Sequence, residues 1–288
     1  MAVYENIGFK DYIKLPGFNA SLLKSYSISP KYGYYMENRP FKGSQAMNIG
    51  TVAHSLILEG EAATDKLLSE QFITEGFPVN ETSGKPFGET SKKWKGWLLT
   101  LPKYKRVILP EELERVKAQA KAVAEHQPSV DLLRDCQYRE TAVTWKCEYT
   151  GQDMKALVDF FGKDKSGDIK TFGRSLSMGA LEREMYDRQY HMQFSMYAGG
   201  LHMNGFDTEF FAIFVQSKDD YDVGCFNINY TALEQGRSDY IQAIANYHKA
   251  RQNKVRAGRF PQVQDLGIPY YAVDELQNAD NLPVTFGE

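Results

Sequence analysis

The stretch KALVDFFGKDKSGDIKT, residues 155–171, places two carboxylates inside runs that otherwise have the apolar pattern of strands. Asp159 lies in the first run, and Asp168 lies in the second, two residues before Lys170. Side chains two apart on a strand share a face, so Asp168 and Lys170 are predicted to project together. A carboxylate on a half-buried strand costs several kcal/mol unless something neutralises it. The pattern therefore predicts a strand pair that binds a metal ion.

A turn over residues 162–167 would join these two strands as a hairpin. In that register Asp159 lies opposite Lys170 and Phe161 opposite Asp168, which gathers both carboxylates and the amine on one patch. Oxygen ligands of this kind suit Mg2+ or Mn2+, and a neighbouring ammonium can orient a water and stabilise charge on a scissile phosphate. A surface salt bridge is the commoner role of a D-x-K tripeptide on a strand, so the tripeptide alone leaves both interpretations open.

The order of predicted elements indicates an α+β, or mixed α/β, fold with a central sheet flanked by helices. Apolar spacing predicts helices, an alternating pattern predicts three antiparallel strands, and a further helix, two strands and a long helix follow. The predicted helices cover about 19–30, 44–60, 110–127, 177–205 and 231–257, and the predicted strands about 138–151, 154–162, 167–173, 210–216 and 221–229.

The 288 residues are enough for one large domain or two modest ones, and 42% hydrophobic content allows a real core. We expect a single domain over 1–288, with a helical part to about 135, a sheet-containing core over about 136–260 and a tail over 261–288. The formal charge of -3 means that any nucleic-acid binding must come from a local basic patch. The first residues lack a signal-peptide pattern and no apolar run spans a bilayer, so a cytoplasmic location without membrane contact is expected.

A set of motifs then appears in the order used by the RecB-like and RecE-like branches of the PD-(D/E)XK nuclease superfamily. The chain most resembles the RecE (exonuclease VIII)-like recombination exonucleases of phages and prophages, over most of its length and least over 78–105 and the C-terminal tail. One departure is that Val158, where the family name implies proline, precedes the first acid. The motif residues are His54 in GTVAH, Asp159, Asp168-Ile169-Lys170, Gln193 and Tyr197.

This resemblance implies a restriction-endonuclease-like core in which a divalent cation, Mg2+ with Mn2+ as a substitute, is bound beside a catalytic lysine. Without the motif order, His54 would be a core-edge histidine and Tyr197 part of a core stripe with Tyr186 and Tyr190. An acid on the preceding strand, Glu140 or Glu148, would either help to hold a second metal or be a surface glutamate. The implied metal ligands are His54, Asp159, Asp168 and the carbonyl of Ile169, and the implied catalytic residues are Lys170, Asp159, Asp168, Gln193 and Tyr197.

Basic and aromatic residues outside the motifs are candidates for DNA contact. Lys92, Lys93 and Trp94 lie in a lysine-rich loop, where phosphate contact with base stacking and a solvated loop anchored by tryptophans are equal alternatives. Arg174 and Arg188 follow the proposed lysine and would line a channel toward it.

The resemblance implies an exodeoxyribonuclease that resects linear double-stranded DNA from 5' to 3', leaving 3' single-stranded ends for recombination. It also implies a homo-oligomeric ring, a trimer or tetramer, and a single-strand annealing protein as partner. The alternatives are a non-catalytic DNA-binding protein with a nuclease fold and an endonuclease or Cas4-like processing nuclease. Three cysteines without CxxC spacing disfavour the iron-sulfur version of the last.

Overall fold

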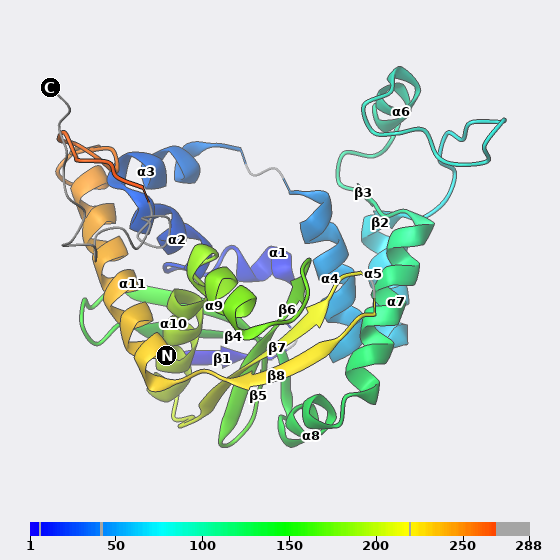
Figure 1. The fold of residues 1–288 in the computed structure, drawn as a ribbon. Helices are drawn as coiled ribbons and strands as arrows, with labels where there is room; N and C mark the ends of the chain where they lie inside the picture. The colour runs from blue at the N-terminus through cyan, green and yellow to red at the C-terminus, as the bar shows by residue number, and fades with distance from the viewer. Residues whose placement is uncertain (6, 41–42, 219, 269–288) are drawn as a thin grey trace, which may run out of the picture.

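The computed structural model describes residues 1–5, 7–40, 43–218 and 220–268 and arranges them around a six-stranded sheet (Figure 1). Neighbouring strands are antiparallel except β6 and β7, which run parallel because two helices make the crossover between them. The predicted mixed fold class is confirmed. In spatial order the strands are β1 (Ala2–Tyr4), β4 (Tyr138–Lys146), β5 (Asp153–Phe161), β6 (Lys165–Phe172), β7 (Glu209–Gln216) and β8 (Val223–Asn227).

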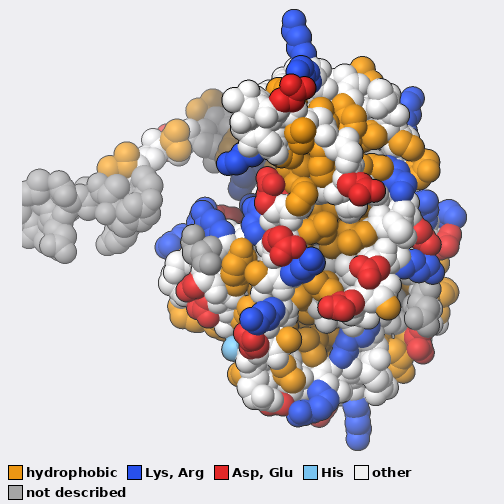
Figure 2. Space-filling model, turned by 90° about the vertical axis from the view of Figure 1, so that its right-hand side faces the viewer, with side chains coloured by type: hydrophobic (Ala, Val, Ile, Leu, Met, Phe, Trp, Pro, Cys, Tyr) orange, Lys and Arg blue, Asp and Glu red, His pale blue; other side chains and the backbone are white. Residues whose placement is uncertain are grey.

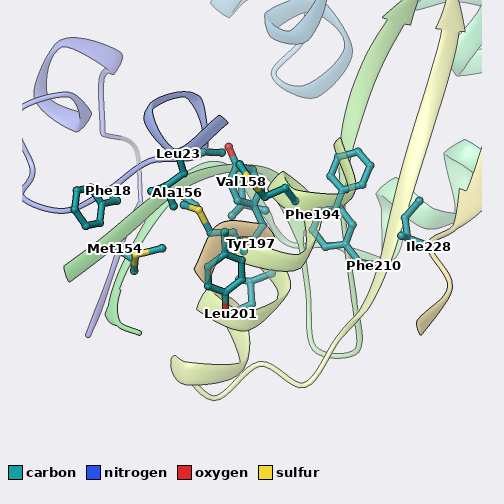
Figure 3. Close-up of a cluster of buried hydrophobic side chains, with 14 of the residues drawn as sticks. Phe18, Leu23, Met154, Ala156, Val158, Phe194, Tyr197, Leu201, Phe210 and Ile228 are labelled. Atoms are coloured by element: carbon teal, nitrogen blue, oxygen red, sulfur yellow. The ribbon is translucent and has the colours of Figure 1, made fainter. Parts of the chain in front are cut away.

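One face of the sheet shares the larger core with three helices. Leu23, Val158 and Phe194 are fully buried in that core, and Figure 3 shows them together with Tyr197 and Leu201. Two shorter helices, α3 (Pro30–Asn38) and α9 (Met178–Asp187), pack against this layer, and α1 (Phe9–Tyr12) precedes it. The three covering helices are α2 (Ala20–Ile28), α10 (Tyr190–Met203) and α11 (Tyr230–Arg251).

The opposite face of the sheet carries a second, smaller core. Leu58, Val123 and Leu132 pack there against Phe160 and Ile169 of the strands. The site described below therefore lies in a sheet that is covered on both faces. The helices on this side are α4 (Gln45–Leu58), α5 (Glu61–Gln71), α7 (Pro110–Glu125) and α8 (Gln127–Asp135).

Residues 74–105 form a separate excursion, which we call the lysine arm. Its base is closed by two short parallel strands, β2 (Phe72–Ile73) and β3 (Arg106–Val107), and it contains the helix α6 (Lys92–Leu98). Figure 1 shows the arm standing away from the sheet. The predicted surface loop is therefore partly helical, because Ser91 caps α6 by accepting a hydrogen bond from the Trp94 amide at 3.1 Å.

Local capping chemistry explains where the N-terminal helices begin. The Asn19 side chain accepts from the Leu22 amide at 2.8 Å, as expected for a helix that starts at Ala20. Pro30 redirects the chain and at the same time opens α3, since Ser29 caps the new helix through the Tyr32 amide at 3.1 Å.

Two predicted helix boundaries are wrong, and one strand was not predicted. The predicted single helix over 177–205 is two helices, because Gln189 adopts a left-handed conformation with φ 53°. The last helix ends at Arg251 and not near Ala257. The sheet also takes an edge strand from the N-terminus, where Val3 pairs with Val143. Of the predicted tail, residues 269–288 lie outside the described residues. No helix in the described ranges combines the length and apolar character needed to cross a bilayer.

The predicted hairpin register between β5 and β6 is also wrong. Gly162 donates its amide to the Lys165 carbonyl at 2.8 Å, so the turn is shorter than expected and Phe160 pairs with Gly167. Continued along the strands, that register puts Asp159 opposite Asp168, and regular pairing stops before it reaches them. The two acids therefore meet where the strands separate.

Candidate metal and phosphate site

Three potential metal ligands converge beside this gap between β5 and β6. The Nδ1 atom of His54, on α4, lies 3.4 Å from Asp159 Oδ2 and 3.6 Å from Glu140 Oε1. One ligand atom from each of the three residues lies within 4.8 Å of the other two. An imidazole and two carboxylates at this separation form a donor set suited to a divalent cation.

The regular alternation of side chains between the two faces of the sheet is interrupted where these acids lie. Val158 and Phe161 belong to the same core although they are three residues apart, so the alternation of β5 slips by one position around Asp159. On β4, Glu140 occupies the position opposite Asp159 and has a φ of 41°, which is unusual for a residue with a side chain. The paired distortion places both carboxylates at His54, and non-glycine residues in this conformation concentrate at functional sites.

The Asp159 side chain also bridges the gap by a hydrogen bond to the backbone of β6. Its Oδ2 atom accepts the Ile169 amide at 2.7 Å, and the residue is only 6% exposed. The N–H and C=O groups of one strand residue point toward the same edge, so the Ile169 carbonyl faces the same gap. This orientation agrees with the predicted role of that carbonyl as a ligand.

Asp168 is held differently, by groups on the other side of the gap. It is 1% exposed, its Oδ1 atom accepts from Gln193 Nε2 at 2.8 Å, and its Oδ2 atom forms an ion pair with the Lys170 ammonium. Apart from this ion pair, Oδ2 has no hydrogen-bond partner among the described residues, although it is buried. Such an atom is a candidate for coordination of a cation.

Lys170 and Gln193 lie among aromatic rings. The Lys170 Nζ atom is 5.0 Å from the centroid of the Tyr190 ring and 5.8 Å from that of Phe194. Tyr197, one turn beyond Gln193, is 8% exposed and belongs to the large core, where burial raises its pKa well above the ordinary value. Tyr197 is thus a core residue on the helix that carries Gln193, and its predicted catalytic role stays a prediction.

The electrostatics of the site are those of opposite charges packed closely together in a buried place. Burial and the nearby Asp168 carboxylate raise the pKa of Asp159 to about 7. Burial opposes the charged form of His54, yet Asp159 and Glu140 raise its pKa to about 9. Burial likewise opposes the charge of Lys170, and the Asp168 carboxylate outweighs it, so the pKa of Lys170 is raised. A divalent cation would replace the protons that His54 and Asp159 hold in its absence, so the residues present fit a metal site.

A second amine joins this centre from α2 and was not among the predicted site residues. Lys24 Nζ donates to Gln193 Oε1 at 2.8 Å and lies 4.9 Å from the Tyr190 ring centroid. The only sequence signal was a lysine beside the apolar pair Leu22-Leu23, and its partner lies 169 residues away.

The predicted DNA-contacting arginines lie near the site but at the surface. Arg188 follows α9, is 67% exposed and donates from Nε to Glu184 at 3.0 Å. Arg174 lies exposed in the bend after β6. Both remain available for contact with a substrate.

The predicted residues of the lysine arm divide into two groups. Lys92 and Lys93 are exposed, and Lys93 lies over the Phe87 ring at 4.6 Å. Trp94 is only 3% exposed, because it packs on Phe77 and Trp97, so the structure favours the alternative in which tryptophans anchor the loop over base stacking by this ring. Figure 2, which views the side that carries α5 and α7, shows acidic and basic side chains interspersed among apolar ones. The arm therefore offers separate lysines, and not a continuous basic patch, for contact with phosphates.

Comparison with known proteins gives one family and one fold. Residues 19–264 match the family described as PDDEXK-like domain of unknown function (DUF3799). No curated protein matches the chain significantly. A crystal structure of a "Putative exonuclease" from Eubacterium rectale superposes with a TM-score of 0.60 at 11% sequence identity, covering 96% of this chain and 99% of that one. At this identity the likeness establishes the fold.

Proposed function

The chain belongs to this PDDEXK-like family, and from that premise we propose that it is a metal-dependent exonuclease acting on linear double-stranded DNA. The observation that carries the proposal is the convergence of His54, Glu140 and Asp159 at the gap where Asp168 and Lys170 also lie. An acid cluster beside a buried amine is the arrangement needed to hold a cation and a phosphate together.

His54 and Asp159 would hold the cation, Mg2+ or Mn2+, together with Asp168 and the Ile169 carbonyl, and Glu140 is placed to add a further oxygen. When bound, a divalent cation polarises a phosphoryl oxygen and lowers the pKa of a coordinated water. The chain's own contribution is orientation: Gln193 fixes Asp168 by a 2.8 Å hydrogen bond, and Asp159 is fixed by the Ile169 amide.

Lys170 supplies the positive charge beside these acids. The Asp168 carboxylate raises the pKa of Lys170, so its side chain is an ammonium in the metal-free site. From this position it would donate to the attacking water or to the phosphoryl oxygen that gains negative charge. The Tyr190 and Phe194 rings lie beside this ammonium, and the Lys170 side chain is only 15% exposed. The aromatic surroundings strengthen the interaction of this ammonium with an anion.

The finer parts of the proposal rest on the resemblance to RecE-like enzymes. They are 5'-to-3' polarity, 3' single-stranded products used in recombination, a ring of three or four subunits around the duplex, a single-strand annealing partner and an origin in a phage or prophage. A ring would keep each site on its strand between turnovers, which favours processive resection.

Incubation with linear and covalently closed duplex DNA, each with Mg2+ or with EDTA, tests the activity. Linear DNA should disappear only with Mg2+, closed circles should survive, and a Lys170→Met variant should digest linear DNA at least about 100-fold more slowly. Digestion of circles would indicate an endonuclease, and no digestion of either form would indicate a DNA-binding protein. Duplexes labelled at the 5' or the 3' end then report polarity, and non-denaturing sizing reports the subunit number.

A further inference from the structure

Lys24 has an environment unlike that of the chain's surface lysines. It is half-buried on α2, and its single side-chain hydrogen bond within the described ranges goes to the neutral Gln193 amide. A second hydrogen bond, from Nε2 of Gln189, the residue before α10, to Ser27 Oγ on α2 at 2.7 Å, also holds α2 against the start of α10. The position of the Lys24 amine is therefore fixed by the fold.

The charges around this amine are mostly positive. Among the residues that the structure describes, no carboxylate lies within ion-pair distance of Lys24, whereas Lys170 pairs with Asp168. Burial and the neighbouring Lys170 ammonium lower the pKa of Lys24 to about 7; the Asp168 carboxylate opposes this shift in part, and Arg188 adds to it. A half-buried ammonium beside other cations is unfavourable unless an anion joins it.

The hydrogen-bonding capacity of Lys24 points the same way. An ammonium group has three donors, and one of them is used on Gln193 Oε1. Gln193 links Lys24 to the metal site, because its Nε2 atom donates to Asp168 Oδ1 at 2.8 Å. Only the side-chain amide of Gln193 therefore lies between the Lys24 ammonium, with its two unused donors, and the Asp168 carboxylate.

We propose that Lys24 binds a phosphate group of the substrate strand and positions that strand against the Asp168–Lys170 pair. The proposal rests on the nuclease function inferred above and adds a substrate-binding residue to it. Because the phosphate could be a terminal monoester or an internal diester, the shared chemistry is a phosphoryl oxygen. Lys24 also orients Gln193, so its loss should disturb the placement of DNA more than the affinity for metal.

The test measures DNA binding without cleavage, by fluorescence anisotropy of a short linear duplex in EDTA. Lys24→Met should weaken binding about tenfold and lower the slope of log K against log salt by about 0.9, the value for one phosphate contact. Lys24→Arg should restore most of the affinity. Lys31→Met, which changes an exposed lysine on the adjacent helix α3, should bind like the wild type. Lys24→Gln provides a second neutral variant with a polar side chain.

Duplexes with a 5'-phosphate and with a 5'-hydroxyl show whether Lys24 binds the terminal phosphate monoester or an internal phosphodiester. A loss confined to the phosphorylated duplex assigns Lys24 to the terminal monoester, and an equal loss on both assigns it to the backbone. In turnover assays the Lys24 variants should raise KM by a larger factor than they lower kcat, with unchanged Mn2+ affinity.

Wild-type affinity and salt slope in both neutral variants would overturn the proposal. So would a Lys24→Arg protein as weak as Lys24→Met with a lowered melting temperature, because that pair of results marks a structural role. Since binding is measured in EDTA, these outcomes do not depend on whether the wild type cleaves DNA.

Discussion

The two carboxylates of the site lie in opposite electrostatic settings. Asp159 meets another acid, Glu140, and a histidine, and its pKa is raised to about 7. Asp168 already has a cation, Lys170, and an amide donor, Gln193. We call the first group the acid side and the second, with Lys24, the amine side.

This difference assigns separate tasks to the two sides. The acid side concentrates negative charge and depends on a cation from outside, so it is expected to determine metal affinity. The amine side is neutralised from within, so it is expected to determine how the phosphate is placed and how its developing charge is stabilised. Substitutions on the two sides should therefore affect different measurements.

Asp159→Asn should have the largest effect, because it removes a ligand while keeping an oxygen that can accept the Ile169 amide. Cleavage should fall by more than about 10³-fold and Mn2+ binding, followed by titration calorimetry, should be lost. Asp153→Asn, at the exposed start of the same strand, is the matched control and should behave like the wild type. Normal Mn2+ binding by the Asp159 variant would contradict the claim that the acid side binds the metal.

Lys170→Met should lower cleavage by about 10²–10³-fold and leave Mn2+ affinity at least as tight as in the wild type. Methionine keeps the stem that packs near Tyr190, and loss of the ammonium leaves Asp168 free for the metal. Lys165→Met, which alters a surface ion pair with Asp135 on the same strand, is the control. If the Lys170 variant lost its metal instead, the division of tasks between the two sides would be wrong.

Glu140→Gln should weaken Mn2+ binding by about 10–100-fold, the range typical for groups that support a metal site. The remaining histidine and aspartates should still allow slow cleavage at high Mg2+. Glu148→Gln tests the other acid on this part of the chain and should change nothing, since Glu148 is exposed. Equal metal affinities in the two variants would restrict the acid side to His54 and Asp159.

The smallest effect is expected in the lysine arm. Replacing Lys92 and Lys93 together by alanine should weaken duplex binding a few-fold and reduce the salt slope by about 0.9 for each phosphate that is no longer neutralised. The rate at saturating DNA should not change, because the arm does not contribute to the metal site. The paired change of Lys117 and Lys121, exposed on α7, is the control. An unchanged slope would remove the arm from the DNA-binding surface.

The sequence predicted much of this architecture because the signals were local. The Asn19 cap, the apolar spacing of α4 and the period of two in β4 and β5 all depend on neighbouring residues. The order of the site residues was likewise visible in the chain, and the fold brings His54, Asp159, Asp168, Lys170 and Gln193 to one gap.

The remaining features depend on contacts between distant residues. The register of β5 and β6 follows from a short turn and from a side chain, Asp159, that takes a backbone amide, and alternation alone cannot reveal either. The polar sequence around Trp94 left base stacking and anchoring open as alternatives, and its packing against Phe77 and Trp97 favours anchoring. Lys24 became significant only when α2 met α10.

The central claim is that His54 and the acids from β4, β5 and β6 bind one divalent cation beside Lys170. Anomalous diffraction from crystals soaked in Mn2+ tests it most directly. The account predicts a peak within about 2.0–2.6 Å of His54 and Asp159 ligand atoms, with Lys170 adjacent. A peak elsewhere, with these groups left uncoordinated, would contradict it.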